Sequence, residues 1–379
     1  MPASGTARGV RLATLFRRAA SSARPRVKEP RSRPGSEWET VLNLRAAIVN
    51  VVIAALPILV LTAAFVAMWG SPDAAIDFRS VTPAIRGLAH GTDPYVVEGL
   101  ARGGHFLWTV LCGWLLAPLA WMPGGWLLAI ALQIVGLVSA LWLLEVRDWR
   151  AYALALAWPA TVNSVQTANI TILVAVFVAA GWRTRGSPFC GLWLGLAVAV
   201  KLFAWPVLVW LAATRRWRAL IAATTVQVIG LLATVPYISI VRFARYEREV
   251  DRVLSGQAIT LKAMLLDQGV WGAQAITLAV GLTILWFGRR DLAWCVVSAL
   301  VLSPIVWLHY FDLLLFPLAL WSAPFWAWTI PFGLWVAPGE GNGAPWQTAT
   351  SLGVAAATVA VSWRWRNGER VRRLPQSSL

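Results

Sequence analysis

The first candidate for chemistry is Asp77, in the stretch "AIDF" that follows the first long apolar run of the chain. Ile76 and Phe78 flank it, and a carboxylate in partly apolar surroundings holds its proton more tightly and can act as a general base. The nearby acids Asp73 and Asp93 lie in "SPD" and "TDPY", which are typical turn sequences. Asp77 is therefore the candidate base of this segment, although an acid just beyond a helix end can also be merely solvated.

Two more ionisable side chains lie inside apolar sequence. Lys201 occurs in "LGLAVAVKLFAWPVLVW", and a lysine at the centre of a membrane span costs about 2.5–3.5 kcal/mol on insertion scales. Either its ammonium group reaches up to a lipid headgroup, or it meets an anionic phosphate in a cavity. His309 in "SPIVWLHYFD", next to Tyr310, is either a hydrogen-bonded core group or a member of the same site.

The elements that must hold these residues are membrane helices. The chain of 379 residues is 58% hydrophobic and 13% charged, with a mean hydropathy of +0.64. Soluble domains have about 45–50% apolar and about 25% charged residues, so this composition is typical of a polytopic membrane protein. We expect an all-α polytopic membrane protein with about 10–12 transmembrane helices, extracytoplasmic loops and interfacial helices. Stretches long enough to cross the hydrocarbon are 46–69, 124–144, 218–240, 270–287 and 346–363.

Composition and motifs also argue against several classes of function. The chain has three histidines, and its three cysteines lack CxxC spacing, so we expect no metal. The absence of a GxxxxGK[ST] motif argues against ATP-driven transport. The formal charge of +16 comes from arginines in the tail and in loops between spans, which indicates contact with membrane lipids and not with nucleic acid. No cofactor is expected.

Basic clusters predict the orientation of the chain. Short basic loops lie at 181–187, 214–218 and 288–291, and both ends of the chain are basic. The positive-inside rule places all of them in the cytoplasm. We therefore expect a largely disordered cytoplasmic arm (1–45), a membrane domain (46–363) and a cytoplasmic tail (364–379), in the inner membrane of a bacterium.

Three apolar runs are expected to rise and return as broken hairpins, because basic loops flank them on one side of the membrane. They are interrupted at "VNSVQTAN" (162–169), "VKLFAWP" (200–206) and "SPIVWLHYFD" (303–312). Interrupted helices at membrane depth are tolerated where they line a protein cavity. The breaks should therefore converge on one outward-facing cavity, on the side of the segment 73–95, with Asn163, Gln166, Asn169, Lys201 and His309.

A polar stretch at 241–269 is expected on the same outer side, and it is rich in basic residues. One interpretation is a helix with salt bridges such as Arg245–Glu249 and Arg248–Asp251. The other is contact with an anionic lipid phosphate, which would explain basic residues outside the cytoplasm.

Six short motifs occur in a characteristic order over about residues 45–325. They are "DF" after the first span, "GTDPY", "QTAN", "GLWLGLAVAVKLFAWP", "SGQAITLKAML" and "LSPIVWLHY". This order resembles glycosyltransferase family 87, the polyprenyl-phosphate-mannose-dependent mannosyltransferases with the type C membrane fold. The resemblance implies an extracytoplasmic active site that transfers a mannosyl residue to a lipid or glycan acceptor, with inversion at the anomeric carbon and without a nucleotide sugar.

The resemblance also implies roles for single residues. Asp77 would be the base that deprotonates the acceptor hydroxyl, and His309 would pair with it or touch the leaving phosphate. Lys201 matches the family's lysine in the same region. Taken with the broken hairpins and the outer basic stretch, the predicted substrate-binding residues are Lys201, Arg79, Gln166, Asn169, Tyr310 and Arg245.

Alternatives stay open at this point. Tyr310 stands where the family usually has a second histidine, and "HFLWTVLCGWLLAP" replaces its usual "YPP", so the acceptor and the sugar are undecided. The donor sugar is mannose or, alternatively, arabinofuranose or glucose. A lipid-linked-sugar transporter or flippase would also use broken helices and basic side chains. A membrane assembly partner without catalysis is a third class.

Overall fold

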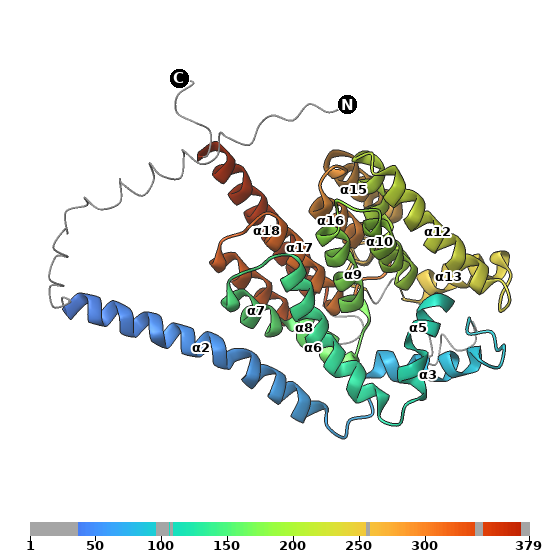
Figure 1. Ribbon diagram of the computed structural model, residues 1–379, viewed down its shortest axis with the longest axis horizontal. Coiled ribbons are helices and arrows are strands. Elements are labelled where there is room, and N and C mark those ends of the chain that lie inside the picture. Colours follow the sequence, from blue (N-terminus) through green and yellow to red (C-terminus); the bar gives the residue numbers. More distant parts are fainter. Residues whose placement is uncertain (1–36, 96–105, 107–108, 255–257, 338–343, 373–379) are drawn as a thin grey trace, which may run out of the picture. The chain divides into compact units, whose positions relative to one another are not determined.

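The computed structural model describes residues 37–95, 106, 109–254, 258–337 and 344–372, and every regular element within these ranges is helical (Figure 1). The expectation of an all-α fold is confirmed. The N-terminal arm lies largely outside the described residues, although residues 37–45 form the start of the first helix.

The helices follow one another with short connections. In the first half of the chain they are α2 (Glu37–Met68), α3 (Ile76–Leu88), α5 (Val110–Trp121), α6 (Gly125–Leu143), α7 (Trp149–Leu156), α8 (Pro159–Thr167), α9 (Thr171–Arg183) and α10 (Phe189–Val200). In the second half they are η1 (Leu202–Ala204), α11 (Pro206–Ala213), α12 (Trp217–Thr234), α13 (Ile240–Leu254), α14 (Leu261–Asp267), α15 (Ala273–Gly288), α16 (Leu292–Leu302), η3 (Leu308–Leu314), α17 (Leu315–Leu320), η4 (Phe325–Val336) and α18 (Pro345–Arg372). Contacts divide the chain into residues 1–49 and residues 50–379, and the second part contains every helix from α3 onward.

Three helices are long and apolar enough to cross a membrane, by length and composition: residues Val41–Met68 of α2, α6 and α12. The bent pair α8 and α9 adds a fourth if it counts as one span. The predicted stretch 270–287 corresponds to α15, a shorter apolar helix, and 346–363 lies in α18, which is not among the helices apolar enough to qualify. Long helices thus account for only part of the 10–12 spans expected from the sequence, and the described chain supplies shorter apolar helices besides.

All three interruptions predicted from the sequence are breaks in the structure. The axes of α8 and α9 differ by 116°, and Ala168 between them has a left-handed φ of 53°. α10 ends because Lys201 is extended, with φ −141° and ψ 114°, and α11 begins at Pro206, where a proline loses no helical hydrogen bond. α16 ends two residues before Pro304, and the chain resumes as η3.

The helices α9, α10 and α12 pack in sequence, with α6 on the other side of α9 (Figure 1). Glycines let α10 and α12 approach closely, as small residues do in membrane helices. A Cβ added to Gly191 would lie 1.7 Å from the carbonyl oxygen of Ala219, and one added to Gly195 would lie 2.9 Å from the Cβ of Val226. The N-terminal turns of α10 and α12 are therefore in backbone contact.

Replacing Gly191 should separate these two helices. We expect Gly191→Ala to lower the free energy of unfolding by about 3 kcal/mol, the upper end for overpacking, because the obstacle is backbone and cannot rotate away. Gly353→Ala in α18 is the control, since nothing lies within 4 Å of its added Cβ, and it should be neutral or stabilising by about 0.5–1 kcal/mol. Denaturant unfolding in detergent measures both, and equal stabilities would contradict the close contact.

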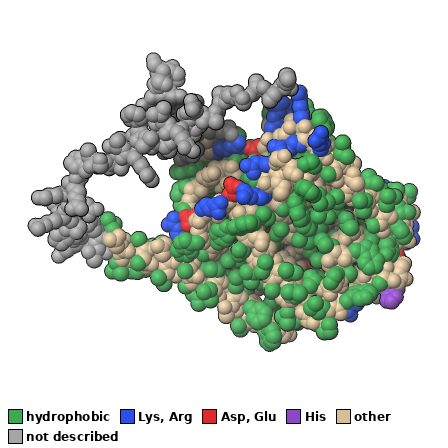
Figure 2. Space-filling view, in the orientation of Figure 1, with side chains coloured by type: hydrophobic (Ala, Val, Ile, Leu, Met, Phe, Trp, Pro, Cys, Tyr) green, Lys and Arg blue, Asp and Glu red, His purple; other side chains and the backbone are tan. Residues whose placement is uncertain are grey.

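Hydrophobic side chains cover most of the face shown in Figure 2, and Lys and Arg side chains gather toward its upper part. Large apolar residues are exposed on α6, α12 and α15, for example Val135, Leu232 and Phe287. An apolar surface of this extent marks contact with another apolar phase, here lipid. The chain is a membrane protein, as its composition indicated.

Candidate functional site

Asp77 lies in the first turn of α3 and is half-buried. The helix follows Ala75, whose φ of 54° is left-handed, and the Ala75 amide donates to the backbone carbonyl of Gln166 over 2.7 Å. The buried side chains of Phe78 and Val81 then hold the helix against the core. The polar break at the end of α8 therefore fixes where Asp77 sits.

The side chain of Asn169, in the break between α8 and α9, joins Asp77 to Lys201. Its Nδ2 donates to Asp77 Oδ2 over 2.7 Å, and its Oδ1 accepts from Lys201 Nζ over 2.8 Å. Oδ1 also accepts from the backbone N and the Oγ1 of Thr171, over 2.9 Å and 2.7 Å. Because donors surround Oδ1, the amide has one orientation. A carboxylate and an ammonium group are therefore held on either side of a single buried amide.

Lys201 is buried at the point where α10 ends. Its Nζ donates a second hydrogen bond to Thr171 Oγ1 over 2.9 Å and lies 4.1 Å from the centre of the Tyr310 ring. An ammonium group has three donors, so two are used in hydrogen bonds and the aromatic face stabilises the remaining charge. The interpretation in which Lys201 reaches up to a lipid headgroup is wrong, because the side chain turns into the protein.

His309 and Tyr310 are supplied by η3, in the break of the third hairpin, and both are buried. The Nδ1 of His309 lies 3.0 Å from Oδ1 of Asn163, and with the amide in this orientation Nδ1 donates the hydrogen bond and Nε2 carries the lone pair. Nε2 is buried and has no hydrogen-bond partner among the described residues. The two rings lie 5.1 Å apart between centres, which places this basic nitrogen beside the ring that covers Lys201.

Five of the eight predicted site residues therefore meet, namely Asp77, Asn169, Lys201, Tyr310 and His309. Gln166 takes part through its backbone carbonyl. The structure does not bring Arg79 and Arg245 into this group. Nη1 of Arg79 lies 3.4 Å from the carbonyl oxygens of Pro72 and Ala74, before α3. Arg245 is exposed on α13 and forms no hydrogen bond or ion pair with any part of the chain that is described.

The ion pairs of α13 differ from those that the sequence suggested. Glu249 pairs with Arg252 at 2.8 Å and not with Arg245. Asp251 pairs with Lys262 at 2.8 Å, so α13 is tied to α14. The i,i+3 and i,i+4 spacings allowed the predicted pairs, but Glu249 pairs with another residue of α13 and Asp251 with a residue of α14.

Glu247 on α13 should make stability depend on pH, because burial raises the pKa of Glu247 from 4.5 to about 7. The folded state then binds the proton more tightly than the unfolded state. The free energy of unfolding should therefore fall as the pH rises from 4.5 to about 7, and it should level off at higher pH. Glu247→Gln should remove this part of the slope in thermal unfolding in detergent. Glu249→Gln on the same helix is the control, and an unchanged slope in Glu247→Gln would count against this assignment.

A model of glycosyltransferase family 87 matches residues 106–330, more than half of the chain. The chain belongs to glycosyltransferase family 87. The family match covers Asn169, Lys201, His309 and Tyr310 but begins after Asp77. No curated protein and no solved structure matches the chain. As a family 87 member with membrane helices, the protein is a membrane glycosyltransferase, which requires a sugar donor and an acceptor.

The sequence did not indicate two parts of this candidate site. Thr171 binds both Asn169 and Lys201, and its only signal was a hydroxyl two residues after Asn169. Asp312 is fully buried and accepts hydrogen bonds from Thr161 Oγ1 over 2.8 Å and Ser164 Oγ over 2.5 Å. It lies one 3₁₀ turn after His309, so these bonds hold η3 against α8 and orient His309.

Among the residues that the structure describes, the candidate site has no group of acids, histidines or cysteines that could hold a metal ion. In the part of the chain that the structure describes, three or more such side chains do not come together anywhere. What the cluster does hold is one carboxylate at its half-buried edge, one buried ammonium group and one unprotonated imidazole nitrogen. This set can accept a proton and stabilise a developing negative charge.

Proposed function

We propose that this family 87 protein transfers a mannosyl residue from a polyprenyl-phosphate donor to a lipid or glycan acceptor, with inversion at the anomeric carbon. The observation that supports this most is the bridge from Asp77 through Asn169 to Lys201. A base and a cation at a fixed separation suit a reaction in which a hydroxyl loses a proton while a phosphate leaves with negative charge.

The proposed reaction is one displacement. The acceptor oxygen attacks C1 of the sugar and passes its proton to Asp77. The bond between C1 and the phosphate oxygen breaks, and its electron pair stays on the polyprenyl phosphate. Two hydrogen bonds and the Tyr310 ring surround the Nζ of Lys201 and leave little room for direct contact with the phosphate. Lys201 therefore stabilises the phosphate through its positive charge. Attack opposite the leaving group inverts C1.

His309 has a place in the same scheme. Its Nε2 is an acceptor that no described residue uses, so a hydroxyl of the donor or the acceptor can donate to it. The site is proposed to lie on the extracytoplasmic side, with both termini in the cytoplasm of a bacterial cell, because the basic loops 181–187, 214–218 and 288–291 lie at the other ends of the broken hairpins.

The test uses purified protein in nanodiscs with labelled polyprenyl-phosphate mannose and a lipid extract. Label should move into a new lipid or glycan, and the product should have the opposite anomeric configuration. Parallel reactions contain the arabinofuranosyl and glucosyl donors. Transfer from one of these and none from the mannosyl donor would refute the donor sugar but keep the reaction class.

A lipid-linked-sugar transporter or flippase is the second candidate, and the three helix breaks are the observation that favours it. It predicts movement of labelled lipid across a vesicle membrane without any change in the sugar linkage. Lipid movement with all three donors intact would replace the transferase proposal with this one.

A further inference from the structure

A strongly basic pocket lies at the opposite end of α10 from Lys201. It has a volume of about 450 Å³ and lies between the turns 185–188 and 215–219. Four of its nine lining residues are arginines and none is acidic: the arginines are Arg185, Arg215, Arg216 and Arg218. α10 has 12 residues, so the pocket lies about 18 Å from the Asp77–Lys201 cluster and is a separate site.

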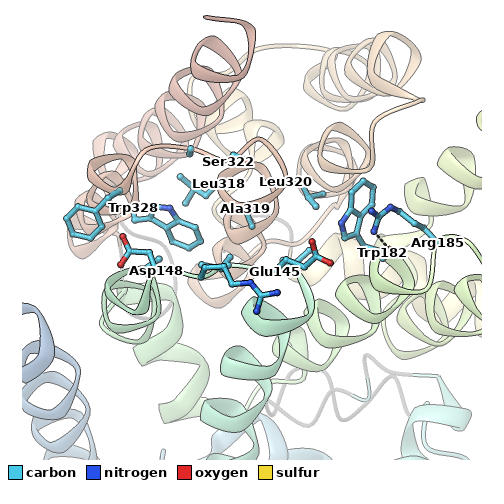
Figure 3. A pocket seen from close by; sticks show the side chains of 15 residues that line it. Glu145, Asp148, Trp182, Arg185, Leu318, Ala319, Leu320, Ser322 and Trp328 are labelled. Carbon is cyan, nitrogen blue, oxygen red and sulfur yellow. Dashed lines mark hydrogen bonds between the residues drawn. The ribbon is translucent and has the colours of Figure 1, made fainter. Parts of the chain in front are cut away.

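Two of the arginines are held in position by tryptophans. The Cζ of Arg185 lies 4.4 Å from the centre of the Trp182 ring, and its Nη1 donates to the Trp182 carbonyl over 3.1 Å. Figure 3 shows this pair at the edge of a neighbouring pocket, which Arg185 and Trp182 also line. The Cζ of Arg216 lies 4.9 Å from the Trp210 ring, and the two tryptophan rings are 6.1 Å apart. Stacking occupies the face of a guanidinium group and leaves N–H groups at its edge for an anion. The Nε of Arg216 is buried and has no partner among the described residues.

The local backbone is unfavourable for arginine in the absence of an anion. Arg216 is the N-cap of α12 and Arg218 lies in its first turn, where the helix dipole disfavours cations and an N-cap should accept hydrogen bonds. Arg215 has a φ of 58° at the end of α11, with the Arg215 amide bonded to Ala212 and the Arg216 amide to Leu211. Glycine usually occupies this position. A bound anion would compensate both costs.

Exposed apolar side chains continue from the pocket along the same two helices. Phe189 and Leu192 are exposed on α10, and Trp217 and Ile221 are exposed on α12. A charged pocket next to an apolar surface matches a lipid with an anionic headgroup and acyl chains. We propose that this pocket binds a phosphate group, carried by an anionic lipid. The proposal is independent of the donor sugar and of the transfer reaction.

The positive-inside rule alone does not require this arrangement. The rule counts the basic residues in a loop and does not depend on where their side chains point. Arg290 illustrates the difference, because it lies in the basic turn after α15, is exposed and does not line the pocket. It is therefore the matched control for a loss of charge without a loss of the pocket.

The experiment measures ligand binding to the full chain in detergent. The probes are short-chain phosphatidylglycerol, phosphatidylcholine of equal chain length, and inorganic phosphate at constant ionic strength. Phosphatidylglycerol should bind and raise the unfolding temperature. Arg215→Gly and Arg218→Gln should each weaken its binding roughly tenfold or more, and Arg290→Gln should leave it unchanged. Glycine is favoured at a positive φ, so Arg215→Gly removes a charge without straining the fold.

The outcomes separate the sources of the phosphate. Binding of phosphatidylglycerol alone supports a lipid ligand, and binding of inorganic phosphate through the same arginines supports a site for the phosphate group itself. If neither anion binds, the proposal is overturned. It is also overturned if phosphatidylcholine binds as tightly as phosphatidylglycerol, or if Arg290→Gln weakens binding as much as Arg215→Gly. The transferase assay is not used, so failure here says nothing against the proposed reaction.

Discussion

Asp77→Asn is expected to lower the turnover number of sugar transfer by roughly 10²–10⁴-fold, the usual contribution of a general base. The amide has the shape of the carboxylate but cannot take a proton from the acceptor. Asp77 is half-buried in the first turn of α3, and its Oδ2 accepts a hydrogen bond from Asn169 Nδ2. The substitution therefore also exchanges one carboxylate oxygen of residue 77, close to this donor, for an amide nitrogen. The KM for the donor should change much less than the turnover number. Label transfer from the donor under saturating conditions gives both quantities.

Asp73→Asn is the matched control for this prediction. Asp73 lies four residues earlier in the same segment and is exposed. Its removal takes away an equal charge from the same segment and should leave turnover within about twofold of the wild type, as for a surface substitution. If Asp77→Asn retains near-normal turnover, Asp77 is not the base. If both variants lose activity equally, the effect is due to surface charge.

Asn169→Leu should have the largest effect on stability among changes in the cluster, with loss of activity as well. Leucine has a similar size but removes the acceptor for Lys201 Nζ and the donor to Asp77 Oδ2. Removing a partner from a buried charge costs about 3–5 kcal/mol, and Lys201 would keep only Thr171 Oγ1 as a hydrogen-bond acceptor. We expect the free energy of unfolding to fall by about 3 kcal/mol or more. Denaturant unfolding in detergent measures this change.

Asn169→Asp separates the two halves of the bridge. A carboxylate still accepts from Lys201 and Thr171, so most of the stability should return. It cannot donate to Asp77 and repels its charge, so turnover should stay low. Gln227→Leu is the control, because Gln227 makes a single hydrogen bond to the Gly195 carbonyl outside the cluster and should cost about 1 kcal/mol with activity kept. Full activity in Asn169→Asp would show that the bridge has no catalytic importance.

The sequence predicted the breaks of the helices and most of the buried site. Prolines, a lysine and amide side chains inside apolar runs are costly unless they line a cavity, so their positions were informative. The types and positions of Asn169, Lys201 and His309 were enough to predict that they lie close together, as they do in the structure. Asp77 was named from its apolar neighbours, and the structure places it against Asn169.

The surface residues were less predictable, for a physical reason. Arg79 and Arg245 were chosen because basic residues near a site suggest phosphate binding. The side chain of an exposed arginine, however, can take several positions that differ little in free energy. In the structure, Arg79 bonds to backbone carbonyls and Arg245 is exposed. Thr171 was missed because threonine is common in apolar helices, and only the tertiary contact shows that its hydroxyl supports both Asn169 and Lys201.

The order of partners along the chain bears on how the protein is made. Lys201 is held by Asn169 and Thr171, and Asp312 is held by Thr161 and Ser164, so each buried ionisable group is synthesised after its partners. Chains are made and begin to fold from the N-terminus. When Lys201 is added to the chain, both residues that accept its hydrogen bonds have already been made. The segment 161–171 thus supplies hydrogen-bond partners for two buried ionisable residues that follow it in the chain.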